Sequence, residues 1–152
     1  MPANDPALPD PLPLFPLQMV LFPGAVLWLK VFEARYLDLM SRTLREQQPF
    51  GVICLKQGRE AGATTQAVEL EEVGVLARLE EVDAEQAGIL RVRCTGTQRF
   101  RRRAAPTMLD NGLWVCPVSV LPGDTARMPG PAMLPTVQAL AGAIKTLTAQ
   151  GR

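Results

Sequence analysis

The segment Ile89-Leu-Arg-Val-Arg-Cys-Thr-Gly-Thr-Gln-Arg-Phe100 alternates apolar and polar side chains over most of its length. In an extended chain, one face carries Leu90, Val92, Cys94 and Phe100, and the other carries Ile89, Arg91, Arg93 and Arg99. A period of two residues is typical of a β-strand with one face on a core and the other in water. The segment therefore predicts a long strand and makes the fold class β-rich.

The β pattern continues on both sides of this strand. Residues 68–82 predict a preceding strand, interrupted by Gly74, and residues 83–88 predict a turn. Downstream, Asp110-Asn-Gly112 between apolar runs predicts a hairpin turn that takes positive φ twice. Residues 113–121 then predict the returning strand, and Pro117 marks it as an edge or bulged strand.

The N-terminal half predicts three more strands and a helix. Residues 12–17 (Leu-Pro-Leu-Phe-Pro-Leu) alternate, but their two prolines indicate an edge or irregular strand. Residues 25–32 predict a second strand, with Leu27, Leu29 and Val31 on one face and Val26, Trp28 and Lys30 on the other. Residues 51–56 predict a short buried strand, and residues 57–67 a surface loop. Between these, residues 33–48 predict a helix whose apolar stripe is Leu37, Met40 and Leu44.

The C-terminal part differs in composition from the strands. Residues 122–135 are rich in Pro and Gly and predict a linker, and residues 136–150 predict a helix. One apolar stripe runs along that helix, formed by Val137, Leu140, Ile144 and Leu147. We expect self-association through this stripe or a mobile C-terminus, with docking on the chain's own barrel as the third choice. The expected organisation is a Pro-rich tail at 1–11, a β-barrel domain at 12–121, the linker and the helix.

Residue types exclude several classes of enzyme. The chain of 152 residues has no histidine, which removes His-based nucleophilic catalysis, His-bound metals and the usual general base near neutral pH. Neither common glycine-rich phosphate loop occurs. Ser41 falls in the predicted helix and Ser119 in a predicted strand, away from the sharp turn that exposes a nucleophile. We expect a non-enzymatic protein that uses no metal and no cofactor.

Charge and cysteine content indicate an ordinary intracellular domain. Cys54, Cys94 and Cys116 are far apart and lie in apolar stretches, so we interpret them as small buried residues. The formal net charge of +1 gives no bulk attraction to nucleic acid or membrane. The sequence shows no signal peptide and no membrane-spanning run. We therefore expect a cytoplasmic protein without membrane contact.

Five motifs resemble, in order, landmarks of the Lon protease N-terminal domain family. They are Leu12-Pro-Leu-Phe-Pro-Leu17 with Val20-Leu-Phe-Pro-Gly24, then Phe32-Glu-Ala-Arg-Tyr36, Phe50-Gly-Val52, Glu72-Val-Gly-Val75 and Gly96-Thr-Gln-Arg-Phe100. Phe32–Tyr36 has the form seen in free-standing members, which lack the ATPase and protease domains. Five motifs in order are far more specific than any one of them. The resemblance covers residues 10–121.

The resemblance implies both a fold and a function. The implied fold is a PUA-like pseudo-barrel of about six strands with one inserted helix, followed by a C-terminal helix. The implied function is non-catalytic recognition of unfolded or tagged polypeptide, or of a partner protein, in protein quality control. Catalysis is not implied, because the ATPase and the protease of Lon lie in later domains.

The motif residues are most simply structural. Pro23 and Gly24 would form a turn, Glu33 and Arg35 a helix cap and an ion pair holding helix to barrel, and Tyr36 a core aromatic. Peptide contacts need apolar side chains that are incompletely buried. We select Phe22 and Trp28 as peptide-binding residues, because aromatic anchors dominate recognition surfaces.

RNA binding is the alternative function, since PUA-like barrels also serve RNA enzymes. Its candidate residues are Arg91, Arg93, Arg99, Phe100 and Arg101, because a basic strand with an interleaved aromatic can follow phosphates and stack a base. The competing interpretation is a paired surface, in which carboxylates of neighbouring strands neutralise the arginines. The expected partners in that interpretation are Glu69, Glu71 and Glu80.

Overall fold

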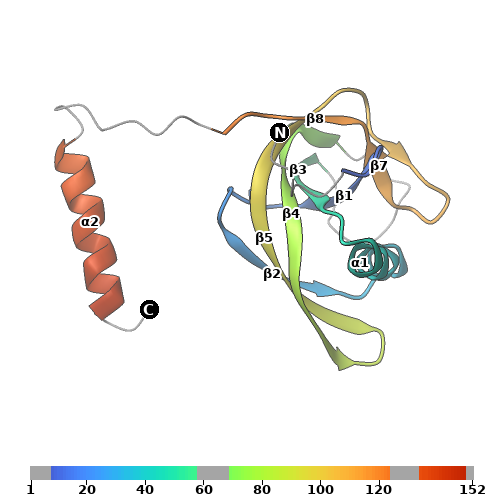
Figure 1. The fold of residues 1–152 in the computed structure, drawn as a ribbon, viewed down its shortest axis with the longest axis horizontal. Helices are drawn as coiled ribbons and strands as arrows, with labels where there is room; N and C mark the ends of the chain where they lie inside the picture. The colour runs from blue at the N-terminus through green and yellow to red at the C-terminus, as the bar shows by residue number, and fades with distance from the viewer. Residues whose placement is uncertain (1–7, 58–68, 124–133, 150–152) are drawn as a thin grey trace.

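The computed structural model describes residues 8–57, 69–123 and 134–149. Within these ranges it contains eight strands and two helices. In chain order they are β1 Leu12–Leu17, β2 Val26–Val31, α1 Ala34–Glu46, β3 Phe50–Gln57, β4 Glu69–Gln86, β5 Ile89–Arg102, β6 Thr107–Met108, β7 Trp114–Cys116, β8 Val118–Val120 and α2 Leu134–Ala149. The strands form one curled body with α1 at its side, and α2 lies apart from it (Figure 1).

All eight strands belong to one mixed sheet. Its order is β2-β5-β4-β3-β1-β7-β6, and β8 pairs with β5 away from this path. The pair β1–β3 is parallel. The sheet wraps around its core without closing into a barrel, because β2 and β6 stand at its two ends. This arrangement confirms the predicted PUA-like pseudo-barrel with one inserted helix and a following helix.

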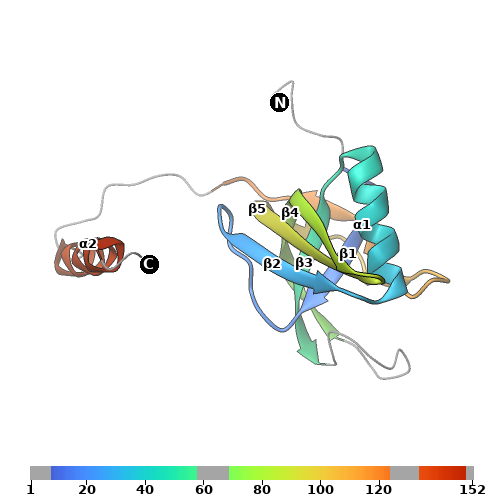
Figure 2. The same ribbon diagram turned by 90° about the horizontal axis from the view of Figure 1, so that it is seen from below.

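The alternation in β5 is confirmed by burial. Val92, Cys94 and Phe100 are fully buried, whereas Arg91 and Arg93 on the other face are partly or fully exposed. β2 alternates in the same way, with its odd-numbered side chains in the core. α1 covers this core from one side (Figure 2). In both strands the period of two therefore separates a core-facing side from a solvent-exposed side, as predicted.

The expected edge position of the strand at residues 12–17 is wrong. β1 lies inside the sheet order, between β3 and β7, and all six of its residues are buried. The register explains how two prolines are tolerated there. Leu12–Leu14 is registered with β7, whereas Leu14–Leu17 is registered with β3. Pro13 and Pro16 thus each lie in a half of β1 that pairs with a neighbouring strand on one side only. A proline there has a side without a partner strand, so its missing N–H is tolerated as it is in an edge strand.

Two predicted turns differ in detail from the structure. The turn expected at 83–88 is shorter, because β4 continues to Gln86 and Gly88 alone takes positive φ, at 79°. In the turn at 110–112, Gly112 takes positive φ (90°) while Asn111 does not. Gly112 N–H donates to the carbonyl of Leu109, and Leu109 N–H donates to that of Leu113. This is a type I turn followed by a glycine bulge, which needs one positive φ instead of two.

The buried stripe of α1 is rotated from the predicted one. Its buried side chains are Tyr36, Leu39, Met40 and Thr43, while Leu44 is exposed. Tyr36 sets this rotation, because its ring stacks on Phe15 of β1 with the centroids 4.2 Å apart. A tyrosine body contributes more apolar area than a leucine, so it decides which face of the helix is turned inward.

The chain from 113 onward changes neighbours at Pro117. β7 before it pairs with β1, and β8 after it pairs with β5. The predicted strand at 113–121 is therefore two short strands broken at the proline. The expected loop at 57–67 and most of the expected linker lie outside the described residues. No helix in the described ranges is both long and apolar enough to cross a membrane.

Candidate functional site

Exposed apolar side chains are concentrated in one segment of the chain. Outside α2, nine large hydrophobic residues in the described part are exposed, and six of them fall between positions 19 and 32. These six are Met19, Val20, Phe22, Val26, Trp28 and Phe32, and we call them the 19–32 surface. Phe22 is 67% exposed and Trp28 is 50% exposed. A concentration of this kind is typical of a recognition surface, whereas single exposed hydrophobics are ordinary.

Backbone contacts hold this segment against β5. The N–H of Ala25 donates to the carbonyl of Phe22 (3.0 Å), which closes a turn around Pro23 and Gly24. Gly24 takes a φ of 83°, as the sequence predicts. Its N–H donates to the carbonyl of Gly96 (2.8 Å), and the N–H of Gly96 donates to that of Ala25 (2.9 Å). The Pro-Gly turn therefore ends in a bulge that fixes Phe22 beside the start of β2.

Two grooves flank the 19–32 surface, and Met19 lines both. The larger, about 440 Å³, lies between residues 19–23 and strands β3, β4 and β5, with Val73 and Arg99 among its lining residues. The smaller, about 270 Å³, runs beside β2, and we call it the β2 groove. Its lining includes Phe15, Leu17, Trp28, Phe32 and Tyr36. Both grooves therefore combine apolar walls with exposed aromatic side chains.

Two arginines position the ring of Trp28. The guanidinium carbons of Arg91 and Arg93 lie 5.0 and 5.9 Å from its centroid. Contacts of this kind between a cation and an aromatic face are favourable at exposed sites. Trp28 is therefore held on the outer face of the sheet while half of its surface remains free.

The motif residues of the helix entry hold α1 to the β6–β7 turn. Arg35 donates from Nη1 to the carbonyl of Gly112 (2.8 Å), and its Nη2 lies 3.4 Å from Glu33 Oε1. The expected ion pair is thus present. Glu33 is the N-cap residue, but its side chain makes no capping hydrogen bond. Its carboxylate is instead turned to Arg35. Tyr36 is buried, as expected for a core aromatic.

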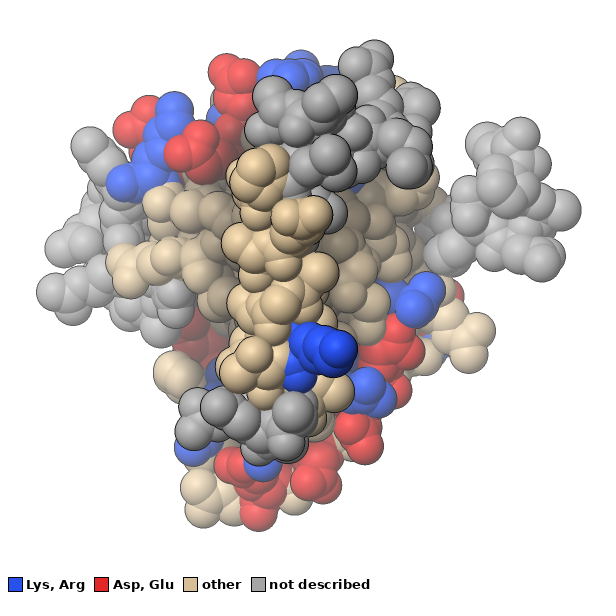
Figure 3. Space-filling model, turned by 90° about the vertical axis from the view of Figure 1, so that its left-hand side faces the viewer, with Lys and Arg blue, Asp and Glu red and all other residues tan. Residues whose placement is uncertain are grey.

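The candidate RNA-binding residues do not form an open basic strip. Each of three arginines has a carboxylate within ion-pair distance: Arg91 with Glu85 (3.9 Å), Arg93 with Glu81 (3.2 Å) and Arg101 with Glu72 (3.3 Å). Phe100 is fully buried in the core and offers no ring to a base. Arg99 lines the larger groove. Seen from the α2 side, basic and acidic side chains are intermingled around the rim of the described surface (Figure 3).

The carboxylates within ion-pair distance of Arg91, Arg93 and Arg101 differ from the three expected ones. Glu80 binds Arg78 at 2.8 Å, and this hydrogen bond, followed by one from Thr95, lowers the pKa of Glu80. Glu71 offers its main-chain carbonyl to Arg102 (2.9 Å). Register shifts in the β4–β5 ladder move the pairing along the strand. A sequence that shows only alternation does not reveal such shifts.

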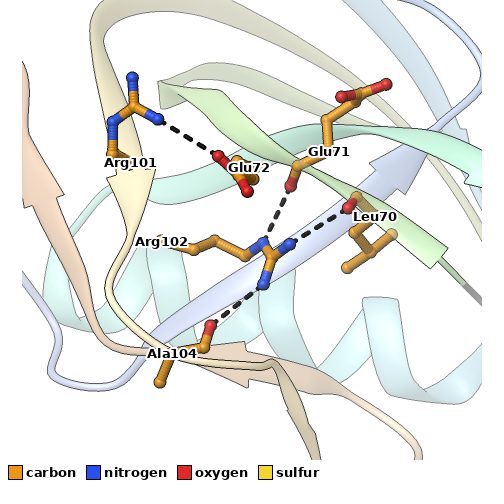
Figure 4. Close-up of polar contacts among 6 residues, drawn as sticks. All are labelled: Leu70, Glu71, Glu72, Arg101, Arg102 and Ala104. Atoms are coloured by element: carbon orange, nitrogen blue, oxygen red, sulfur yellow. Dashed lines mark hydrogen bonds and ion pairs between the residues drawn. The ribbon is translucent and has the colours of Figure 1, made fainter.

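Arg102 is a structural residue that the sequence did not single out. Its guanidinium donates to the carbonyls of Glu71 (2.9 Å), Leu70 (3.2 Å) and Ala104 (3.1 Å) (Figure 4). It thereby joins the start of β4 to the chain leaving β5. The neighbouring Arg101 turns instead to the carboxylate of Glu72. Nothing in the run of three arginines at 101–103 distinguishes these roles.

The candidate nucleophiles in the described part of the chain are its cysteines and serines. Its cysteines are free, and Cys94 and Cys116 are buried. Burial, together with the charge of Glu80, raises the pKa of the Cys94 thiol to about 12. Within the described ranges, no group of three or more Cys, Asp or Glu residues is placed to hold a metal ion. Ser41 and Ser119 are both exposed, on α1 and β8.

The fold and this surface define a class: a β-rich module with an exposed apolar segment. The chain belongs to the family described as the ATP-dependent protease La (LON) substrate-binding domain, whose model matches residues 11–150. It is 33% identical over 130 residues to the Lon protease of Paraburkholderia phytofirmans, covering 84% of this chain and 16% of that protein. The chain thus spans about one sixth of that curated relative.

Solved structures agree with this assignment. A Lon N-terminal domain protein from Xanthomonas campestris matches with a TM-score of 0.71 and 35% identity, over 88% of this chain and 72% of that one. The N-terminal domain of the Mycobacterium avium complex Lon protease matches with a TM-score of 0.65 and 14% identity, over 91% and 69%. The second likeness supports the fold alone.

Proposed function

We propose that this chain is a non-catalytic module that binds unfolded or tagged polypeptide through the 19–32 surface, in the service of protein quality control. The observation that carries the proposal is the gathering of six exposed hydrophobic residues in one segment, beside two grooves. Membership of a substrate-binding family supports it. Phe22 and Trp28 remain the residues we propose as anchors.

The chemistry of the surface fits an unfolded chain. Unfolded polypeptides expose apolar side chains that folded proteins bury, and burying them against Phe22 or Trp28 is favourable. Because the charged side chains around the sheet are paired, they add little attraction for acidic or basic polypeptides. The module would therefore discriminate by apolar exposure instead of by charge. RNA binding is not proposed, because the arginines that would carry it are largely paired and Phe100 is in the core.

A binding measurement with matched variants tests the proposal. Reduced and carboxymethylated α-lactalbumin, labelled with a fluorophore, serves as a permanently unfolded probe, and anisotropy reports its affinity. We expect the double variant Phe22→Ser/Trp28→Ser to bind at least about tenfold more weakly. The control is Leu109→Ser/Val120→Ser, which removes two exposed hydrophobics elsewhere on the domain. Equal affinity in the two double variants, or no binding by the unaltered chain, would contradict the proposal.

A further inference from the structure

The outer edge of β2 is unpaired within the described part of the chain. β2 stands at the end of the sheet order and is paired with β5. It is six residues long, contains no proline, and exposes Val26 and Trp28 on its outer face. An edge of this kind presents a row of backbone donors and acceptors that can accept another strand.

The hydrogen bonds between β5 and the start of β2 determine which residues present that row. The N–H of Gly96 donates to the carbonyl of Ala25, and the register runs on from there as Val26 with Thr95 and Leu27 with Cys94. In an antiparallel ladder, hydrogen-bonded and non-hydrogen-bonded pairs alternate. The odd-numbered residues of β2 therefore bond to β5. The N–H and C=O groups of Val26, Trp28 and Lys30 point to the open side.

An apolar groove runs along the same edge. The β2 groove is lined by every residue from Leu27 to Glu33, and also by Phe15, Leu17, Met19 and Tyr36. Phe15 and Tyr36 are buried and stacked on each other, so this wall is rigid. A row of backbone groups beside an apolar slot is complementary to an extended chain. The backbone of the extended chain would bond to the edge of β2, and every second side chain of that chain would enter the groove.

We infer that an extended apolar segment of polypeptide docks as an additional strand on the outer edge of β2, with alternate side chains in the β2 groove. The inference rests on the proposed function and names the form in which the substrate is recognised. Recognition through the backbone is independent of side-chain identity, so many unfolded sequences fit. A folded domain offers few extended segments that are not already paired, so unfolded chains are favoured.

The first test removes one outward donor. Lys30→Pro deletes an N–H group that points away from β5, so the ladder keeps its bonds, and edge strands tolerate such prolines. Lys30→Ala is the matched control, because it removes the same side chain and keeps the N–H. The probe is a fluorescent peptide of about ten residues with alternating Val and Thr. We expect Lys30→Pro to bind it about three- to tenfold more weakly than Lys30→Ala does, as the loss of one hydrogen bond predicts.

The second test alters the peptide and leaves the protein unchanged, so it does not depend on how Lys30→Pro folds. One version is N-methylated at every Val and the other at every Thr. In an added strand, the N–H groups of alternate residues face β2, so we expect one version to lose binding at least about tenfold and the other to keep it. Which version fails reports whether the added strand runs parallel or antiparallel.

The outcomes separate this inference from the proposed function. If both methylated peptides bind as tightly as the parent while Phe22→Ser/Trp28→Ser still weakens binding, the surface binds polypeptide but not by strand addition, and the inference is overturned. If the unmodified peptide does not bind while unfolded α-lactalbumin does, the inference is overturned and the proposed function stands; if neither binds, both are overturned. A β2-to-β2 dimer of two copies, seen by sedimentation and lost in Lys30→Pro, would assign the edge to self-pairing and also overturn the inference.

Discussion

Gly96 lies directly against the main-chain carbonyl of Phe22: a β-carbon on Gly96 would be 2.5 Å from that oxygen. The same glycine exchanges hydrogen bonds with Gly24 and Ala25 on either side of the bulge. The position of the 19–32 surface on β5 thus depends on the absence of a side chain at position 96.

Replacing Gly96 with alanine should therefore destabilise the fold. A methyl group has no room beside a backbone oxygen that is itself tied into the turn, so the segment must shift. We expect a loss of about 1–3 kcal/mol in the free energy of unfolding, measured by urea denaturation. Gly123→Ala is the control, because a β-carbon there meets nothing within 4 Å. Equal stability of the two variants would show that the turn adjusts freely.

Gly24→Val should destabilise the chain for a different reason. Here a β-carbon also meets nothing within 4 Å, but φ is 83°, a conformation that a β-branched residue adopts only under strain. We expect a cost of about 1–3 kcal/mol, seen as a lower melting temperature. Gly123→Val carries the same side chain at an unstrained position. A melting temperature equal to that of the control would mean that the turn does not require positive φ.

The faces of the strands were predictable from the sequence, whereas their neighbours in the sheet were not. The alternation in β2 and β5 predicted their faces correctly, because one side of each strand lies on the core. The prolines of β1 predicted an edge or irregular strand, and only the edge position is wrong. β1 changes partner at Leu14, so each proline lies in a half of the strand that pairs on one side only. Partner changes of this kind are set by tertiary structure and leave no local pattern.

The candidate site was likewise predictable from the sequence only in part. Phe22 and Trp28 were selected from the sequence as incompletely buried aromatics, and the structure places both on the surface. Val26 lies on the same face as Trp28 in the predicted strand, so the alternation already predicted that it is exposed. Phe32, the last residue of the predicted strand at 25–32, also lies on this face. Met19 had no such signal, because its exposure depends on where the chain enters β2. The binding role of all these residues remains a prediction.

Arg35→Met should loosen α1 from the β6–β7 turn. The variant keeps an apolar stem but loses the hydrogen bond to the Gly112 carbonyl and the ion pair with Glu33. A charged hydrogen bond in a largely buried setting contributes about 1.5–3 kcal/mol, which is the expected loss in unfolding free energy. Arg42→Met breaks the exposed pair with Glu46 and should cost less than about 0.5 kcal/mol. Similar losses in the two variants would contradict this role for Arg35.

Cys94 should make the fold sensitive to alkali. Its thiol has an ordinary pKa of about 9 when exposed, and burial raises the pKa to about 12. Below pH 9 the thiol is protonated in both states, but between pH 9 and 12 only the unfolded state ionises, so stability falls as the pH rises. The contribution is up to about 1.4 kcal/mol per pH unit. Cys94→Ala should show a shallower decline in urea titrations across this window, and parallel declines would rule the contribution out.

The last prediction concerns α2, where Leu140, Ile144 and Leu147 are all exposed. A helix of 16 residues is only marginally stable in water unless it packs against another element. We therefore expect its apolar side chains to contact a partner. We expect concentration-dependent self-association in sedimentation velocity, reduced by Leu140→Ser/Ile144→Ser. The control is Gln138→Ser/Lys145→Ser, which introduces the same two residues on the opposite face of the helix. A chain that stays monomeric at all concentrations would reject self-association, and equal association of the two double variants would place the contact elsewhere.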